Sequence, residues 1–411
     1  MTIVTGTETT IVKKADGSIA SPQGFSARGI HTGMKKRRND LGVILCDVAA
    51  ESAGVYTLSK LQAPPLKVTK QTLAKDGLLR AVVINSGVAN ACTGERGYED
   101  AYTMQQTTAR CFGVPESQVA VNSTGVIGEY LPIDTIVEGI EELAQVEAAD
   151  GADAFCEAIL TTDTVTKQTC HEAVIDGKKV TMGGAAKGSG MIHPNMATML
   201  AFVTTDAKVE RGALQTALKE VTDLTFNRIT VDGDTSTNDM VLAMASGLAG
   251  NEALSPEHPE WDVFVEMLRQ TCEALAKMIA RDGEGATKLI EVAVSGAKND
   301  VEAGKVAKQI VGSDLVKTAM FGRDANWGRI IGAIGQSDAE IDPDHIDISL
   351  GDIQVLSDSR TTAFSEADAA AYLGEETIHV FVDLHVGDGF AKAWGCDLTY
   401  EYVRINASYR T

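Results

Sequence analysis

The chain has 411 residues, enough for two or three domain-sized units, and 44% of them are hydrophobic, as in a globular protein with a substantial core. Its formal net charge is −21, so most of its surface repels phosphate backbones and nucleic-acid binding is not expected. The basic run from Lys35 to Arg38 is the exception, and we interpret it as a solvated loop.

The seven cysteines indicate neither a disulfide framework nor a zinc site, because their number is odd and no CxxC spacing occurs. We expect them to pack as small hydrophobic residues in a reducing cytoplasm. The N-terminus lacks the apolar core of a secretory signal, and no run of about 18 apolar residues is present, so no membrane segment is expected. No motif predicts a metal or another cofactor.

The first part of the chain is expected to contain short strands followed by a helix. Apolar, β-branched runs between turn residues predict strands at Gly24–Ile30, Leu41–Val48 and Leu79–Asn85, and residues 1–70 are expected to form short strands. A helix is predicted at Tyr98–Phe112. The polar loop Asn85–Asn90 follows a strand, where ligand sites are common, although an ordinary turn is an equally good interpretation.

The next stretch leads through a β-hairpin into a glycine-rich loop. Predicted here are a strand at Gln118–Asn122, helices at Ile133–Ala144 and Asp153–Leu160, and a hairpin of Cys170–Ile175 with Lys178–Met182. Two motifs have alternative interpretations. Thr124-Gly125 can offer a hydroxyl and an N–H to one point, as an oxyanion hole requires, or can form a simple turn. The cluster Thr161–Thr164 is typical of capping or turn chemistry.

The central segment Lys187–Leu200, KGSGMIHPNMATML, joins a glycine-rich loop to an apolar run, Met199–Thr205, that predicts a strand. A threonine hydroxyl becomes a good nucleophile beside a base, and a free α-amine on the same residue is one such base. Its pKa of about 7.7–8.0 suits this role near neutral pH. Thr198 would gain that amine if its hydroxyl attacked the Ala197 carbonyl and water then released the ester. The alternative is an ordinary threonine at the entry to a strand.

The remainder of the chain continues to alternate. Helices are predicted at Gly212–Thr222, Met240–Ser246, Trp261–Ile279, Val301–Val311, Trp327–Ile334 and Ala367–Tyr372. Strands are predicted at Asn227–Val231, Lys288–Val294, Thr377–Leu384 and Lys392–Arg404, and a strand or a hairpin is predicted at Ile346–Val355. The polar loop Asp232–Asp239 is expected to cap the helix after it. A change of composition suggests a domain boundary near residue 285.

The segment KGSGMIHPNMATML resembles the self-cleavage signature of the ornithine acetyltransferase family, also called bifunctional glutamate N-acetyltransferase, of arginine biosynthesis. The family also has the motif DGDTSTND, and the likeness extends through most of the chain. It implies an α/β fold with layered α-β-β-α architecture and N-terminal-nucleophile chemistry. It also implies self-cleavage between Ala197 and Thr198 into an alpha chain, 1–197, and a beta chain, 198–411, which associate as a heterotetramer of two copies each.

The same resemblance implies a reaction and the residues that carry it. An acetyl group moves from N2-acetylornithine to glutamate through an acetyl ester on Thr198, and acetyl-CoA is a further candidate donor. Thr198 is the nucleophile, and Thr124 and Gly125 form the oxyanion hole. The residues that the resemblance assigns to substrate binding are Thr164, Lys187, Thr198, Glu284, Asn406 and Thr411.

Alternating strands and helices throughout the chain independently favour the α/β class. Two other functions stay open at this point. One is an amidase or aminopeptidase that uses the same N-terminal threonine with water as the acceptor. The other is a non-catalytic, uncleaved binding protein.

Overall fold

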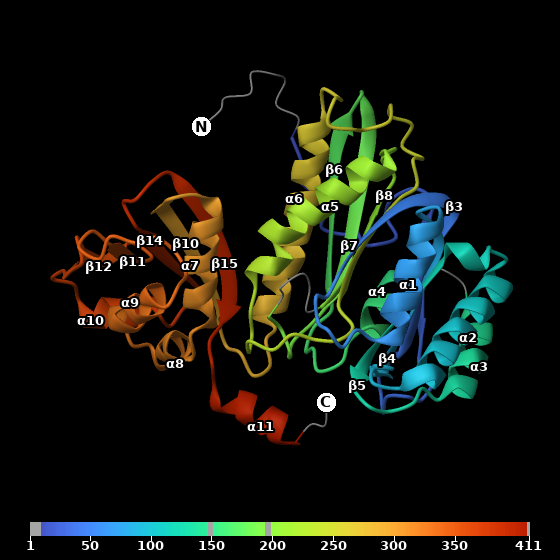
Figure 1. The fold of residues 1–411 in the computed structure, drawn as a ribbon, viewed down its shortest axis with the longest axis horizontal. Helices are drawn as coiled ribbons and strands as arrows, with labels where there is room; N and C mark the ends of the chain where they lie inside the picture. Colours follow the sequence, from blue (N-terminus) through green and yellow to red (C-terminus); the bar gives the residue numbers. More distant parts are fainter. Residues whose placement is uncertain (1–9, 147–150, 194–198, 409–411) are drawn as a thin grey trace.

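The computed structural model describes residues 10–146, 151–193 and 199–408, which form two β-sheets with helices packed against them (Figure 1). The larger sheet has nine strands within these residues, in the order β1-β6-β7-β8-β9-β3-β4-β5, with β2 paired to β3. Its strands are β1 Val12–Lys13, β2 Phe25–Ile30, β3 Leu41–Tyr56, β4 Leu78–Val88, β5 Val119–Val126, β6 Lys167–Ile175, β7 Lys178–Lys187, β8 Leu200–Thr205 and β9 Met240–Ala245.

The long strand β3 divides the larger sheet into two halves. Its first part pairs with β2 and β4, its last part pairs with β9, and a register shift between Leu45 and Ala50 separates the two parts. Side chains alternate between the two faces of a strand. One face of each half therefore packs against the other half, and the opposite face packs against helices. The apolar cluster shared by the halves contains Ile84 of β4 together with Phe202 of β8 and Leu242 of β9.

Helices cover the two outer faces of this folded sheet. The six helices that precede β10 in the described residues are α1 Pro64–Lys75, α2 Gly94–Phe112, α3 Ile133–Leu143, α4 Gly151–Ala158, α5 Arg211–Leu224 and α6 Trp261–Arg281. Helices α2 and α3 share an apolar cluster with β3, β4 and β5, whereas α5 and α6 share one with β6 to β9. The predicted layered α-β-β-α architecture is therefore confirmed.

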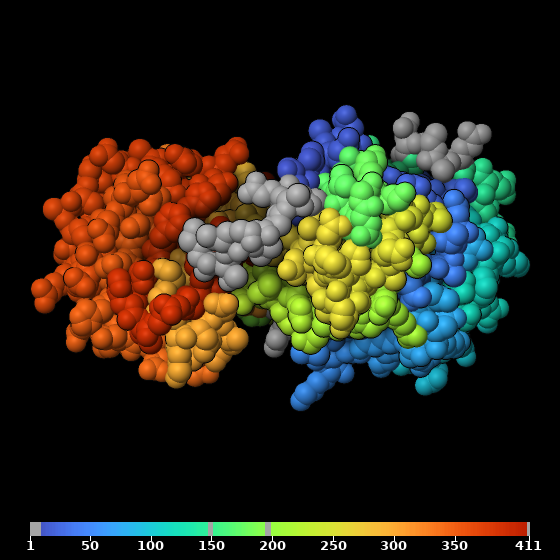
Figure 2. Space-filling view, turned by 90° about the horizontal axis from the view of Figure 1, so that it is seen from above, coloured from blue at the N-terminus to red at the C-terminus, as the bar shows by residue number. Residues whose placement is uncertain are grey.

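A second, smaller sheet forms the C-terminal unit, in the order β13-β12-β11-β14-β10-β15. Its strands are β10 Leu289–Ala297, β11 Asp347–Leu350, β12 Ile353–Ser357, β13 Arg360–Thr361, β14 Thr377–Asp383 and β15 Gly389–Cys396. Its helices are α7 Asp300–Gly312, α8 Asp314–Gly322, α9 Trp327–Gly335 and α10 Glu366–Tyr372, which share a separate apolar core with the sheet. The space-filling view shows this unit as a lobe beside the rest of the chain (Figure 2).

The two units join through the connection between α6 and β10. This connection contains residue 285, near which the sequence suggests a domain boundary. After β15 the chain forms helix α11, Tyr400–Ser408, which projects from the C-terminal unit below the larger one (Figure 1). None of the helices in the described residues is long and apolar enough to cross a lipid bilayer.

Three predicted elements are wrong. The predicted helix Met240–Ser246 is strand β9, since its six residues are buried on both faces, between the shared cluster and the cluster under α5 and α6. A short apolar run of this kind fits either element, and burial on both faces decides for a strand. The predicted strand Lys392–Arg404 ends at Cys396 and is followed by α11. The predicted strand Asn227–Val231 overlaps a 3-10 helix, Phe226–Arg228, and makes a single bridge at Ile229.

Besides α11, two helices were not predicted. Helix α1 begins at Pro64, so residues 1–70 are not limited to short strands. Proline suits the first turn of a helix because its missing N–H has no helical partner there. Helix α8 begins after Ser313, whose side chain accepts a hydrogen bond from the Val316 N–H. This is an N-cap of the usual kind, and it is the local sequence signal that identifies the start of α8.

Candidate active site

A cavity lies where both halves of the larger sheet meet the C-terminal unit. It is bordered by the C-terminal ends of β4, β5 and β7, the N-terminal ends of β8 and β9, the loop after α6, and α11. Parallel strands place their ends, and the loops that follow, at one edge of a sheet, so residues far apart in sequence converge there. The predicted site residues that line the cavity are Thr124, Gly125, Lys187, Glu284 and Asn406.

The remaining predicted site residues do not line the cavity or lie outside the described residues. Thr164 is exposed, and its N–H and its hydroxyl donate hydrogen bonds to the Asp282 carboxylate instead. Its substrate role stays a prediction. Ala197, Thr198 and Thr411 lie outside the described residues. Met199, the residue after Thr198, does line the cavity.

The Thr124-Gly125 pair lies near the end of β5 and is held against β4. The hydroxyl of Thr124 lies 3.4 Å from the Lys187 ammonium, and the Thr124 side chain is buried at the cavity. Gly125 has a φ of +133°, and a Cβ at this position would lie 2.3 Å from the carbonyl carbon of Gly87. Only glycine fits such a backbone. The arrangement can present a hydroxyl and a backbone N–H to a ligand atom, as an oxyanion hole requires.

Lys187 ends strand β7 and places its ammonium group at the wall of the cavity. Its Nζ donates a hydrogen bond to the Thr161 hydroxyl at 2.9 Å. Burial lowers the pKa of Lys187, and the negative charges of Asp163, Asp239 and Glu284 partly oppose that shift. In the part of the chain that the structure describes, no carboxylate forms an ion pair with this ammonium group, which leaves it free to bind an anionic group of a ligand.

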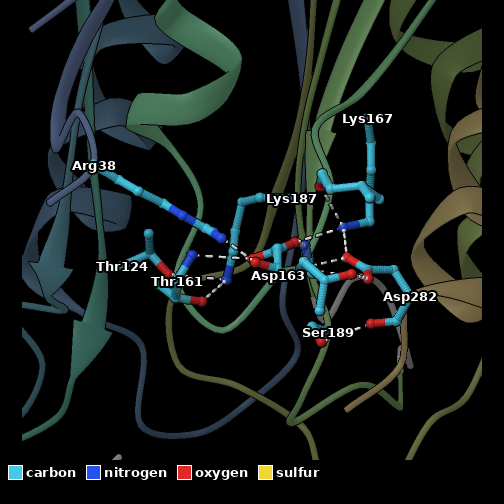
Figure 3. Close-up of polar contacts among 11 residues, drawn as sticks. Arg38, Thr124, Thr161, Asp163, Lys167, Lys187, Ser189 and Asp282 are labelled. Atoms are coloured by element: carbon cyan, nitrogen blue, oxygen red, sulfur yellow. Dashed lines mark hydrogen bonds and ion pairs between the residues drawn. The ribbon is translucent and has the colours of Figure 1, made fainter. Parts of the chain in front are cut away.

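A buried ionic network lies next to Lys187 (Figure 3). The ammonium group of Lys167 lies 2.7 Å from Asp163 and 2.5 Å from Asp282, and all three side chains are almost completely buried. Burial alone would raise the pKa of Asp163, but the charges of Lys167 and Lys187 outweigh it and lower that pKa below its usual range. The carboxylate therefore stays ionised.

The same network holds the backbone of the glycine-rich loop. The Gly188 N–H donates to the Asp163 carboxylate at 2.7 Å, and the Ser189 hydroxyl donates to the Asp282 carbonyl at 2.7 Å. The Thr161 N–H also donates to Asp163, at 3.0 Å. One buried carboxylate thus fixes both the loop that precedes the predicted cleavage point and the threonine that contacts Lys187 (Figure 3).

The opposite wall of the cavity is acidic. Glu284 is buried and accepts a hydrogen bond from the Asn406 side-chain amide at 2.7 Å, which ties α11 to the loop after α6. Gly190 passes close to this carboxylate, and a Cβ there would lie 2.4 Å from it. Both oxygens of Asp232 accept hydrogen bonds from the backbone, from the N–H groups of Met191 and Ile192 at 2.7 and 2.9 Å.

Asp239 is the acidic residue of the cavity whose unpaired oxygen is itself buried. Its side chain is buried, it lines the cavity, and its Oδ2 has no hydrogen-bond partner among the described residues. Burial raises the pKa of Asp239 well above its usual value, against the opposing effects of a hydrogen bond from Ser236 and the charge of Lys187. An ionised carboxyl group in this position is costly unless a ligand or a proton compensates it.

Thr161 and Asp239 are among the cavity residues whose contribution the sequence analysis did not identify. Thr161 belongs to the same short cluster as Thr164, and either hydroxyl could face the site from sequence alone. Asp239 closes the polar loop expected to cap a helix, and it instead precedes strand β9. Its signal is a carboxylate directly before an apolar run, at the edge of the sheet where ligand sites are common.

Comparison with known proteins places this chain among a family of close relatives. The model of the ArgJ family matches residues 26–411. The arginine biosynthesis bifunctional protein ArgJ of Halalkalibacterium halodurans is 63% identical over 402 residues, which cover 98% of each chain. The protein of the same name from Bacillus subtilis is 57% identical over 400 residues, covering 97% of this chain and 98% of that protein.

A solved structure agrees with these matches. The crystal structure of the arginine biosynthesis bifunctional protein argJ from Bacillus halodurans has a chain 66% identical to this one, with a TM-score of 0.51. That match covers 100% of the solved chain but only 52% of this chain.

Proposed function

Because this chain belongs to the ArgJ family, we propose that it is an acetyltransferase of arginine biosynthesis, a glutamate N-acetyltransferase that takes the acetyl group from N2-acetylornithine. The observation that carries the proposal is the convergence at one cavity of Thr124-Gly125, the buried Lys187 and the acidic Glu284, next to Met199. These groups suit an acyl oxygen, a carboxylate and an ammonium group respectively. An N-acetylated amino acid and its free form offer all three.

The reaction has two half-reactions joined by a covalent intermediate. In the first, the Thr198 hydroxyl attacks the acetyl carbonyl, its proton passes to the Thr198 α-amine, and the carbonyl oxygen becomes an oxyanion. The Thr124 hydroxyl and the Gly125 N–H stabilise that oxyanion. The C–N bond then breaks, the nitrogen of ornithine takes the proton, and ornithine leaves. In the second, the glutamate amine attacks the acetyl-Thr198 ester by the same steps in reverse.

The α-amine of Thr198 arises by self-cleavage between Ala197 and Thr198, which divides the protein into chains of residues 1–197 and 198–411. The solved Bacillus halodurans chain covers 52% of this chain, a length that fits one of the two products. The network of Asp163, Lys167 and Asp282 would then cross between the two products and help to hold them together.

We assign the substrate contacts as follows. Lys187 binds the α-carboxylate, Glu284 and Asn406 bind a cationic amine, and Thr164, Thr198 and Thr411 complete the set implied by the family resemblance. The assembly that we propose is a heterotetramer of two alpha and two beta chains in the cytoplasm, with acetyl-CoA as a second acetyl donor for glutamate. The buried, oppositely charged walls of the cavity support the assignment of Lys187 and Glu284.

The proposal is tested by trapping the intermediate. Rapid-quench mass spectrometry after mixing with N2-acetylornithine alone is expected to show an acetyl group on Thr198 of the 198–411 fragment. Thr198→Ala is expected to remain a single band on a denaturing gel and to carry no acetyl group. Processed protein that turns over without an acetylated fragment would contradict the route.

The close relatives do not favour an amidase or aminopeptidase, the alternative that uses the same nucleophile. The ratio of N-acetylglutamate to free acetate formed from N2-acetylornithine in the presence of glutamate separates the two activities. A transferase forms mainly N-acetylglutamate, and an amidase forms acetate whether or not glutamate is present. A single full-length band on a denaturing gel would instead support the uncleaved binding protein.

A further inference from the structure

Asp239 is held in place by the fold but has no described partner for one of its oxygens. The residue is 4% exposed and lines the cavity, and its Oδ2 makes no hydrogen bond to any described residue. Buried carboxyl groups are normally paired or hydrogen-bonded, because an unpaired one loses its hydration without compensation. The unused oxygen therefore indicates a ligand group that carries a hydrogen-bond donor or a positive charge.

The position of Asp239 places this group close to the proposed acyl-transfer centre. Strands β8 and β9 run parallel and pair Leu200 with Met240, and the Met240 N–H donates to the Met199 carbonyl at 3.0 Å. Asp239 precedes Met240 directly, so it lies beside Met199. The charge of Asp239 also interacts with that of Lys187, whose ammonium group is 3.4 Å from the Thr124 hydroxyl.

The other carboxylates of the cavity accept hydrogen bonds from the protein or are exposed to solvent. Asp232 accepts hydrogen bonds from backbone N–H groups with both oxygens, and Glu284 accepts one from Asn406. Asp234 is exposed at the rim. Asp239 thus differs from these three in having an oxygen atom that is itself buried and has no hydrogen-bond partner within the described residues.

We propose that Asp239 binds the α-amino group of the amino acid that accepts the acetyl group, while Lys187 binds its α-carboxylate. This inference rests on the acetyl transfer proposed above and adds a residue to it. The two charged groups of the cavity then match the two charged groups that every free α-amino acid shares, whatever its side chain. Water has no such groups, so the pair also favours transfer of the acetyl group to an amino acid over its loss by hydrolysis.

The test is the partition of the acetyl group in the processed protein. With N2-acetylornithine and a fixed concentration of glutamate, Asp239→Asn is expected to lower the ratio of N-acetylglutamate to acetate by roughly 10- to 100-fold, as loss of a buried charge pair would. Asp388→Asn makes the same chemical change at an exposed position outside the cavity, and is expected to alter the ratio by no more than about twofold.

A second substrate separates amine binding from a role at the nucleophile. p-Nitrophenyl acetate can acetylate the protein but carries no α-amino group, so its burst of p-nitrophenolate reports acylation alone. The loss in this burst for Asp239→Asn is expected to be at least roughly tenfold smaller than the loss in transfer to glutamate. Equal losses in the two assays, or an unchanged partition ratio, would overturn the proposal.

The same contact can be tested by changing the ligand. The affinities for glutamate and for glutarate, which lacks the α-amine, are compared. Wild-type protein is expected to bind glutamate more tightly than glutarate, and Asp239→Asn is expected to lose that preference. If Asp239→Asn is not processed, Asp239→Glu keeps the charge and is measured instead. If neither variant is processed, Asp239 serves the backbone cleavage and the proposal is wrong. Wild-type protein that forms no N-acetylglutamate would refute the proposed function itself, independently of either variant.

Discussion

At the scale of single residues, the cavity combines two ionisable groups whose charged forms are disfavoured by burial. Burial lowers the pKa of Lys187 and raises the pKa of Asp239, and each group partly offsets the other shift. Shifts of this kind, produced by desolvation beside a specific charge partner, cluster at functional sites. Both groups lose hydration on burial, and the charged groups of a bound amino acid can restore part of that free energy.

The hydroxyl of Thr124 provides the first prediction. Thr124→Ala removes one of the two proposed oxyanion donors, so kcat for acetyl transfer is expected to fall by roughly 10²–10³, with a much smaller effect on KM. Steady-state formation of N-acetylglutamate by processed protein measures both constants. Thr166→Ala, an exposed threonine outside the cavity, is the control and is expected to behave as wild type. A loss of less than about threefold in kcat for Thr124→Ala would argue against the assignment.

The carboxyl group of Asp239 provides the second. Its pKa is higher in the folded protein than in the unfolded chain, so the folded state binds the proton more tightly and stability falls as pH rises through the folded pKa. Asp239→Asn removes this penalty and is expected to raise the free energy of unfolding at pH 7 by roughly 0.5–2 kcal/mol, as removal of functional strain often does. The difference from wild type is expected to shrink on acidification.

Thermal unfolding of both proteins without substrate, at pH 7 and at pH 5, measures this effect. A variant that is less stable than wild type at pH 7 would mean that Asp239 is compensated in the free protein. Asp234→Asn serves as the control, because an exposed carboxyl group adds little to stability.

At the scale of elements, the network of Asp163, Lys167 and Asp282 joins two distant pieces of the chain. Asp163 lies in the loop before β6, Lys167 begins β6, and Asp282 follows α6. These contacts fix the glycine-rich loop through Gly188 and Ser189. The loop before the predicted cleavage point therefore depends on buried charges as well as on its glycines.

Removal of the central lysine provides the third prediction. Lys167→Met leaves two buried carboxylates without their shared cation, so the free energy of unfolding is expected to fall by roughly 3–5 kcal/mol. Lys179→Met on the neighbouring strand removes an exposed ion pair with Glu172 and is expected to cost less than about 1 kcal/mol. Denaturant midpoints of the two variants test the difference. Equal midpoints would show that the network contributes little.

At the scale of the whole molecule, the C-terminal unit is part of the site. Its strands pack beside the larger unit through the Lys277–Glu291 ion pair at 2.9 Å and a hydrogen bond from the Thr230 N–H to the Trp394 carbonyl at 3.1 Å. Helix α11 then returns to the cavity with Tyr402 and Asn406. The site is complete only when both units are in place.

Helix α11 provides the fourth prediction. None of its described residues is buried, so deletion of residues 402–411 is expected to lower the melting temperature by no more than about 2–4 °C, the effect of roughly 1 kcal/mol. The deletion removes the Asn406 contact to Glu284, and KM for N2-acetylornithine is expected to rise by roughly tenfold or more. Arg404→Ala, which changes only an exposed pair with Glu401, is the control. An unchanged KM would exclude α11 from the site.

The sequence by itself determined the α/β class and the central motif, and the family resemblance of that motif implied the layered architecture and five of the residues that line the cavity. The α/β class and the motif depend on periodicity and on local chemistry: alternating strand and helix patterns, and a glycine-rich loop before a threonine. The long amphipathic helix around Phe264 and Leu268 is the clearest case, because its burial pattern repeats within one element.

Only the tertiary structure decided which members of short polar or apolar runs face the cavity. Met240–Ala245 is a strand because two separate cores bury its two faces, and no local signal specifies both. Thr161 rather than Thr164 contacts Lys187 because Asp163, between them, is anchored by Lys167. Asp239 stands out only once its burial and its missing partner are known. Each of these outcomes depends on contacts between residues distant in sequence, which periodicity and local propensity do not encode.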